Sequence, residues 1–225
     1  MSDNQSGDWT TNLDSINTKL VWPDITIAES QELYRVWAES GTYDQVIKDP
    51  AAYNGPKALL KAVQSVVTDK NALFLDIGAG TGLVGEVLNE SGYKNLHALE
   101  PQPKFAELTG SKGFYSKVFT QFIGGDSPVS APDDTYDVLV SSGAFAPGHI
   151  PCSAIPEAIR LVKPGGYIII CLREENLTIA TEYRGRLEPL WNKLEEETKW
   201  KLIEKTRYPN HYADKGGLCI LYRVC

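Results

Sequence analysis

A glycine-rich stretch that follows a short apolar run constrains this chain more than any other segment. Residues 72–77 have the composition of a buried strand, residues 78–82 are Gly-Ala-Gly-Thr-Gly, and residues 83–89 have helical periodicity. Glycines permit unusual backbone angles and close approach of a ligand to the main chain. The free N–H groups at the start of a helix attract an anionic group. The segment therefore predicts a strand, a ligand-binding turn and a helix.

The same alternation of apolar runs and helical segments continues along the chain. It predicts strands at 96–99, 117–123, 136–140 and 167–172, and helices at 104–108, 153–162 and around 187–194. Two further strand-like runs, 200–207 and 218–224, are joined by residues 208–217, a connection too short for a crossover helix. We therefore expect a doubly wound, Rossmann-like α/β sheet that is mostly parallel and has an antiparallel C-terminal strand.

The N-terminal part of the chain differs from this pattern. Its clearest periodic piece is 30–39, where Leu33, Tyr34 and Trp37 share a helical face, and Pro56 is well placed as the first residue of the next helix. We expect residues 1–55 to form an extension with a lid helix, and residues 56–225 to form the ligand-binding domain.

Composition excludes several classes of protein. Of 225 residues, 22 are Lys or Arg and 29 are Asp or Glu, so the net charge of −7 argues against an extensive nucleic-acid surface. The longest apolar run, at 167–172, is far shorter than the roughly 20 residues that span a bilayer. The four cysteines and three histidines lack zinc-site spacing, so no metal is expected. The N-terminus is polar and acidic, which favours a cytoplasmic location and leaves a nuclear one open.

The glycine-rich segment resembles the D-x-G-x-G-x-G loop of class I S-adenosylmethionine-dependent methyltransferases. Asp76 opens the motif and Glu100 ends the second predicted strand, where a carboxylate can receive both hydroxyls of a ribose. A dinucleotide fingerprint would instead need glycine at Leu83, which counts against an NAD-dependent oxidoreductase. The likeness extends through 137–143 and 161–166 and covers residues 72–172.

Within that superfamily, residues 143–157, together with Tyr43-Asp44-Gln45, resemble the subfamily of methyltransferase-like protein 27, also called the Williams-Beuren syndrome chromosome region 27 protein. The resemblance implies S-adenosylmethionine as cofactor and supplies no acceptor. It implies that Asp126 faces the adenine amino group and that Ser142 lies beside the methionine portion. The residues expected to bind the cofactor are Asp76, Gly78, Ala79, Gly80, Gly82, Glu100, Pro101, Asp126, Ser127 and Ser142.

Methyl transfer from a sulfonium is an in-line displacement, for which the protein mainly has to orient the reactants. We expect an unidentified acceptor, a small molecule, near the loop after the fourth strand, the 208–217 connection and the lid helix. His149 is the first candidate for a general base and His211 the second, while Tyr43 could close over the cofactor. Adenine-N6 and glutamine-type acceptors are disfavoured, because residues 142–145 are Ser-Gly-Ala-Phe and not the Asn/Asp-Pro-Pro-Tyr/Phe motif of amino-group methyltransferases, and the acidic net charge makes a nucleic-acid partner unlikely. A catalytically idle, cofactor-binding adaptor is the alternative from another class, and protein partners stay open.

Overall fold

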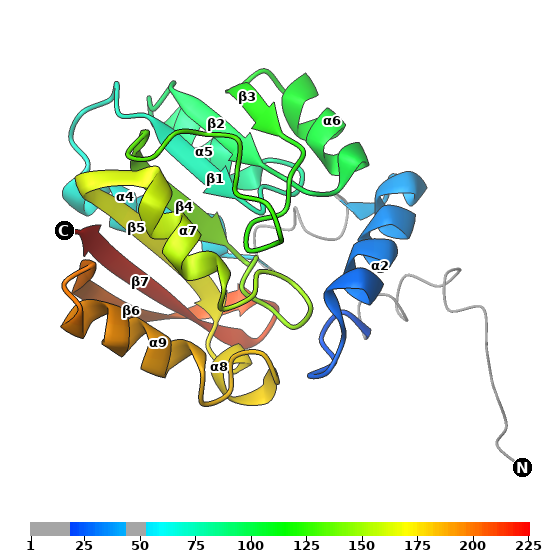
Figure 1. Ribbon diagram of the computed structural model, residues 1–225. Coiled ribbons are helices and arrows are strands. Elements are labelled where there is room, and N and C mark those ends of the chain that lie inside the picture. The colour runs from blue at the N-terminus through cyan, green and yellow to red at the C-terminus, as the bar shows by residue number, and fades with distance from the viewer. Residues whose placement is uncertain (1–18, 44–52) are drawn as a thin grey trace, which may run out of the picture.

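The computed structural model describes residues 19–43 and 53–225. Within them, seven strands form one sheet in the order β3-β2-β1-β4-β5-β7-β6 (Figure 1). The strands are β1 (Phe74–Ile77), β2 (Leu96–Leu99), β3 (Tyr115–Phe119), β4 (Tyr136–Ser142), β5 (Val162–Arg173), β6 (Trp200–Tyr212) and β7 (Lys215–Val224). The helices are α2 (Ile27–Ser40), α4 (Gly55–Val66), α5 (Leu83–Glu90), α6 (Pro103–Ser111), α7 (Ala154–Leu161), α8 (Asn176–Ile179) and α9 (Leu187–Glu196).

The sheet confirms the predicted fold class. Strands β1 to β5 pair in parallel, and β7 lies antiparallel between β5 and β6. The chain leaves β1 toward β2 and β3 and then returns to β4 on the other side of β1. Ligands of doubly wound sheets bind beyond the carboxyl ends of the strands at such a reversal. The topology therefore places the site beyond the ends of β1 and β4.

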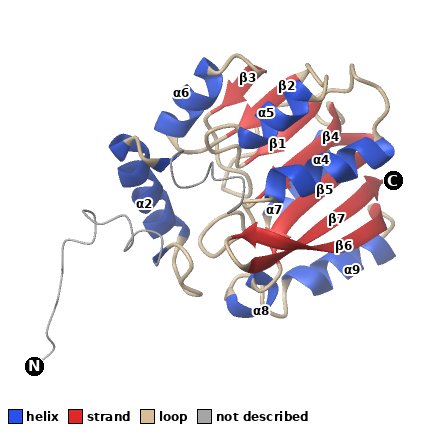
Figure 2. Cartoon of the chain, turned by 180° about the vertical axis from the view of Figure 1, so that it is seen from behind, coloured by secondary structure: helices blue, strands red, loops and turns tan. Residues whose placement is uncertain are grey.

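Both faces of the central strands β1, β4 and β5 are buried, which explains their nearly continuous apolar character, whereas the edge strands β3 and β6 are partly exposed. In β5, Ile168 and Ile170 join one apolar core, whereas Ile169 and Cys171 join the other. Helices α7 and α9 contribute to the first core, and α4 and α5 to the second. Figure 2 shows α4 and α5 in front of the sheet and α9 behind it.

Helix α2 lies beside α6, outside these two layers (Figure 1). Thr26 and Glu29 form a reciprocal capping box at its start, and Gly41 ends it with a left-handed backbone conformation. Leu33 and Trp37 belong to a small separate apolar cluster with residues before the helix. The predicted helix at 30–39 is thus present and longer. The division of the chain at residue 55 stays a prediction, and Asp44 and Gln45 lie outside the described residues.

Several predicted boundaries were wrong. The strand expected at 167–172 begins at Val162, so that the predicted turn at 163–166 lies within β5. The third strand was expected at 117–123, but β3 ends at Phe119, because its neighbour β2 ends at Leu99, the residue paired with Phe119. Residues 208–217 were expected to be a connection, but β6 continues to Tyr212, and a hairpin turn at 213–214 leads into β7. In the described part of the chain, no helix combines the length and apolar character needed to cross a membrane.

Candidate active site

The glycine-rich loop lies where the fold predicts a ligand site. Gly78, Gly80 and Gly82 all have positive φ, and Gly82 is the residue that precedes α5. A Cβ atom on Gly78 would lie 2.4 Å from that of Ala144, so the loop packs directly against the segment after β4. Gly78 and Gly80 line a cavity of about 290 Å³, whereas Ala79 and Gly82 are not among its lining residues. The loop therefore presents part of its backbone to a space large enough for a small ligand.

Glu100, at the end of β2, holds this loop by two hydrogen bonds. One carboxylate oxygen accepts the N–H of Gln102 and the other accepts the N–H of Gly80, each at 2.8 Å. The side chain is only 6% exposed, and burial raises its pKa to about 7 although both N–H groups favour the charged form. Glu100 and the following Pro101 line the cavity, as expected for cofactor-binding residues.

Asp76 lies beneath the loop and is not among the lining residues. One of its oxygens accepts the hydroxyl hydrogen of Tyr115, whose oxygen accepts the N–H of Gly85 at 2.8 Å. The other oxygen is buried and has no hydrogen-bond partner within residues 19–43 and 53–225. Burial raises the pKa of Asp76 to about 7, and the negative charge of Glu100 acts in the same direction. Two carboxyl groups with raised pKa values therefore lie at the loop, a pattern typical of functional sites.

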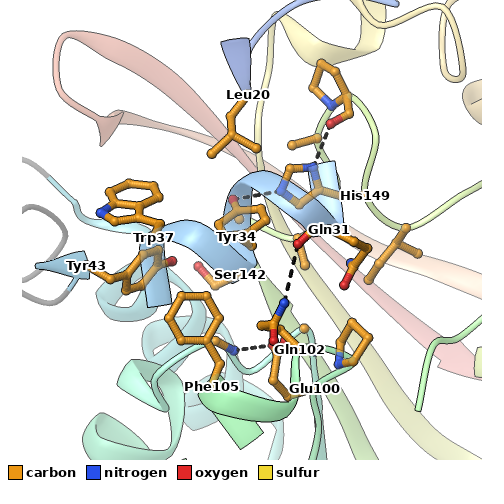
Figure 3. A pocket seen from close by; sticks show the side chains of 18 of the residues that line it. Leu20, Gln31, Tyr34, Trp37, Tyr43, Glu100, Gln102, Phe105, Ser142 and His149 are labelled. Carbon is orange, nitrogen blue, oxygen red and sulfur yellow. Dashed lines mark hydrogen bonds between the residues drawn. The ribbon is translucent and has the colours of Figure 1, made fainter. Parts of the chain in front are cut away.

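Aromatic side chains cover one side of the cavity. Figure 3 shows Tyr34 and Trp37 of α2, together with Tyr43, gathered near Phe105 of α6. The Tyr43 ring centroid lies 4.6 Å from those of both Trp37 and Phe105. Helix α2 is thus packed over the cavity, which is the position expected of a lid.

His149 has both ring nitrogens engaged. Nδ1 lies 2.6 Å from the carbonyl oxygen of Pro147, and Nε2 lies 2.8 Å from the hydroxyl of Tyr34 (Figure 3). A carbonyl can only accept, so Nδ1 carries the proton, and in the neutral ring Nε2 accepts from Tyr34. Burial lowers the pKa of His149, which favours this neutral form. His149 therefore joins α2 to the loop after β4, and its basic nitrogen is occupied while that contact is made.

A second group of polar side chains lies at the ends of β4 and β6. The Tyr53 hydroxyl is 2.7 Å from Oγ of Ser142, and its ring packs edge-on against His211 at 5.4 Å. Nδ1 of His211 hydrogen bonds to the hydroxyl of Tyr208. A Cβ atom on Gly143 would lie 3.9 Å from Nε2 of His211, for which no protein partner is found among the described residues. All but Tyr208 line the cavity.

Of the two histidines that line the cavity, His211 is the one with a ring nitrogen, Nε2, that has no hydrogen-bond partner among residues 19–43 and 53–225. Its side chain is 3% exposed, and burial, with the charge of Arg173 as a smaller cause, lowers its pKa to about 4. The ring is consequently neutral near pH 7, and a neutral imidazole can accept a proton.

The structure does not bring Asp126 and Ser127 to the cavity. Both are exposed, and the neighbouring residues Gln121, Phe122 and Ile123 line the cavity instead. These three residues follow the early end of β3, which is where the sequence prediction of that strand failed.

Several residues of the site had not been singled out from the sequence, among them Tyr53, Tyr115 and Arg173. A signal for Tyr115 exists, because a glycine inside a helix often marks a close contact, and a Cβ on Gly85 would lie within 2.4 Å of the Tyr115 hydroxyl. No local signal marks Tyr53, whose partner Ser142 is 89 residues away. Among the described residues, no cluster of three or more His, Cys, Asp or Glu side chains is arranged to hold a metal ion.

Comparisons with known proteins agree with this geometry. Residues 75–170 match the family model of a methyltransferase domain. The chain is 30% identical over 181 residues to Methyltransferase-like protein 27 of Homo sapiens, an alignment that covers 80% of this chain and 70% of that protein.

Solved structures share the fold at low sequence identity. The crystal structure of the [4+2]-cyclase SpnF superposes with a TM-score of 0.67 at 12% identity, covering 90% of this chain and 98% of that one. A SAM-dependent methyltransferase from Aquifex aeolicus superposes with a TM-score of 0.56 at 15% identity, covering 85% and 98%. With the domain match and the curated relative, these findings show that the chain belongs to the class I S-adenosylmethionine-dependent methyltransferases.

Proposed function

We propose that this chain transfers the methyl group of S-adenosylmethionine to a small-molecule acceptor bound between the lid helix and the ends of β4 and β6. The observation that carries the proposal is one cavity that joins two sets of residues. The glycine-rich loop and Glu100 line one part, and Ser142 and His211 line another. The aromatic side chains that cover the cavity favour a small acceptor over a polymer.

The residues of the first part fit the expected cofactor. Gly80 lines the cavity with open space beside it, since a Cβ there would meet only the Tyr43 hydroxyl, at 3.7 Å. The carboxylate of Glu100 has lone pairs left for the ribose hydroxyls after it accepts two backbone N–H groups. When bound, the cofactor supplies a methyl group on a positively charged sulfur. As the acceptor atom forms its bond to the methyl carbon, the bond between that carbon and the sulfur breaks, and the sulfur keeps the electron pair.

The chain's own contribution is orientation and proton removal. Tyr53 and Ser142 hold each other beside Gly143, on the side of the cavity where β4 ends. We assign the Nδ1 proton of His211 to its hydrogen bond with Tyr208, which leaves the lone pair of Nε2 facing the cavity. In this scheme, the proton that leaves an acceptor hydroxyl or ammonium group passes to Nε2 of His211. His149, the first candidate from the sequence, serves as the lid contact.

The test is titration calorimetry with S-adenosylmethionine and S-adenosylhomocysteine, followed by an assay for S-adenosylhomocysteine formation with small molecules, peptides and RNA as separate acceptor pools. We expect binding of both ligands and turnover in the small-molecule pool only. Turnover confined to the peptide or RNA pool would contradict the small acceptor. Cofactor binding without turnover in any pool would favour the idle adaptor, and no binding would reject the proposal.

A further inference from the structure

Arg173 is the last residue of β5 and lines the cavity beside the acceptor residues. Its Nη2 pairs with the carboxylate of Glu175, which also pairs with Nζ of Lys215 at 3.4 Å. Nε of Arg173 is buried and has no hydrogen-bond partner in the described part of the chain. One carboxylate is therefore shared by two cations, and part of the Arg173 guanidinium lacks a protein acceptor.

The buried Nε–H of Arg173, unpaired among the described residues, destabilises the folded chain unless a ligand supplies an acceptor for it. The Arg173 side chain is only 16% exposed, and burial lowers its pKa, with Asp214 and Tyr212 opposing that effect. A buried donor without an acceptor destabilises the folded chain. The planar guanidinium matches the paired oxygens of a carboxylate or a phosphate, which it can bind through two parallel hydrogen bonds. The missing acceptor has the chemistry of an anionic oxygen group on a ligand.

The neighbouring side chains connect this position to the proposed reaction. Tyr212 and His211 line the same part of the cavity, and His211 is close enough for the charge of Arg173 to disfavour its protonated form. Asn176 also lines it, with its amide nitrogen donating to the carbonyl of Phe145 at 3.0 Å. An anion on Arg173 would weaken the repulsion felt by His211 and make Nε2 a better proton acceptor.

We propose that the methyl acceptor is a small organic carboxylate whose carboxylate group binds Arg173 and whose nucleophile lies toward Ser142 and His211. This inference rests on the methyl transfer proposed above and narrows its acceptor class. Binding of the anion and activation of the base are thereby coupled, so that His211 accepts a proton most readily when the correct acceptor is present.

The experiment follows the Nε–H signal of Arg173 by nitrogen-15 NMR in protein saturated with S-adenosylhomocysteine. The signal is assigned by its loss in Arg173→Lys. The protein is titrated with acetate and benzoate, and in parallel with the uncharged acetamide and benzamide, up to about 100 mM at constant ionic strength, because such fragments bind weakly. Arg207 is the matched control. The guanidinium of Arg207 also forms an ion pair with a glutamate, Glu174, but the Arg207 side chain is 77% exposed.

We expect a saturable shift of the Arg173 signal with acetate or benzoate, at least tenfold smaller with the amides, and no saturable shift of the Arg207 signal. No saturable response, or an equal response to the amides, overturns the proposal. A shift on addition of S-adenosylhomocysteine followed by no response to the carboxylates would assign Arg173 to the cofactor's own carboxylate and also overturn it. If calorimetry shows that the cofactor does not bind, the proposed function fails first, and the same titration of the cofactor-free protein decides the anion site separately.

Discussion

Replacing Glu100 by glutamine tests the cofactor half of the site most directly. The carboxylate already accepts the N–H groups of Gly80 and Gln102, one on each oxygen. A glutamine side chain has one acceptor oxygen and an NH₂ group, so it cannot satisfy both N–H groups and still receive two ribose hydroxyls. A hydrogen bond to a charged group contributes about 1.5–3 kcal/mol. Loss of one such bond therefore weakens binding of S-adenosylhomocysteine about 10- to 150-fold.

The pH dependence of binding provides a second measure of the same residue. Burial raises the pKa of Glu100 to about 7 in the cofactor-free protein. Ribose hydroxyls favour the charged carboxylate, so affinity increases as pH rises toward about 7, by at most tenfold per unit. We expect this slope to be smaller in Glu100→Gln, with the remainder due to Asp76, whose pKa is also raised to about 7.

The raised pKa of Glu100 also determines how the stability of the cofactor-free protein changes with pH. In the unfolded chain the carboxyl group of Glu100 loses its proton at about pH 4.3, whereas in the folded chain it keeps the proton up to about pH 7. Its contribution to the free energy of unfolding is greatest below pH of about 4.3 and is lost as pH rises to about 7. S-adenosylhomocysteine should therefore raise the melting temperature more at about pH 8 than at about pH 6.

Calorimetry on wild type, Glu100→Gln and Glu107→Gln gives the comparison. Glu107 lies on the adjacent helix α6, is 69% exposed and pairs with Lys104, so its substitution changes net charge equally without touching the cavity. Equal dissociation constants and equal pH slopes for wild type and Glu100→Gln would refute the role assigned to this carboxylate.

Two further predictions concern the support of the loop and the closure of the lid. Tyr115→Phe leaves an oxygen of Asp76 and the N–H of Gly85 unpaired in a buried place, which lowers the free energy of unfolding by about 1–3 kcal/mol. Thermal denaturation measures this loss, and an unchanged melting temperature would contradict it. The burial of neutral His149 against α2 contributes fully above pH of about 6.5, and its contribution is lost as pH falls, because burial lowers the pKa of His149. Hydrogen exchange of α2, corrected for intrinsic rates, should show less protection at about pH 5.5 than at about pH 7.5, and little dependence on pH in His149→Gln; pH-independent protection in wild type would argue against this role of His149.

The sequence was most informative where structure is decided locally. The glycine-rich loop and Glu100 could be located because a strand end, a turn and a helix start each leave signals within a few residues. The pairing of Tyr53 with Ser142 joins segments far apart in the chain, and no local pattern encodes it. His149 was the first candidate for a general base, and no local pattern predicts that its Nε2 contacts Tyr34 of α2, the observation for which we propose His211 instead.

The third strand illustrates why an edge is harder to predict than a centre. Residues 120–123 have enough apolar character to continue a strand, but β2 offers no partner beyond Leu99. They leave the sheet and become part of the cavity wall, which also displaces Asp126 from the position that the family resemblance implies. Whether a segment continues as a strand thus depends on the length of the neighbouring strand, which the segment's own residues do not encode.

The hairpin of β6 and β7 separates two roles: its tip reaches the cavity, and its strands pair with the rest of the sheet. Because β7 runs against β5, the tight turn at 213–214 lies at the same edge of the sheet as the glycine-rich loop. Only the tip of this hairpin, with His211 and Tyr212, reaches the cavity, while the rest pairs on the far side of β5. If the acceptor binds where we propose, insertions or exchanges at the tip alter which acceptor is methylated without disturbing β1 or β2. The hairpin would then make acceptor choice a replaceable part of the enzyme, and grafting tips between relatives would be a route to new substrates.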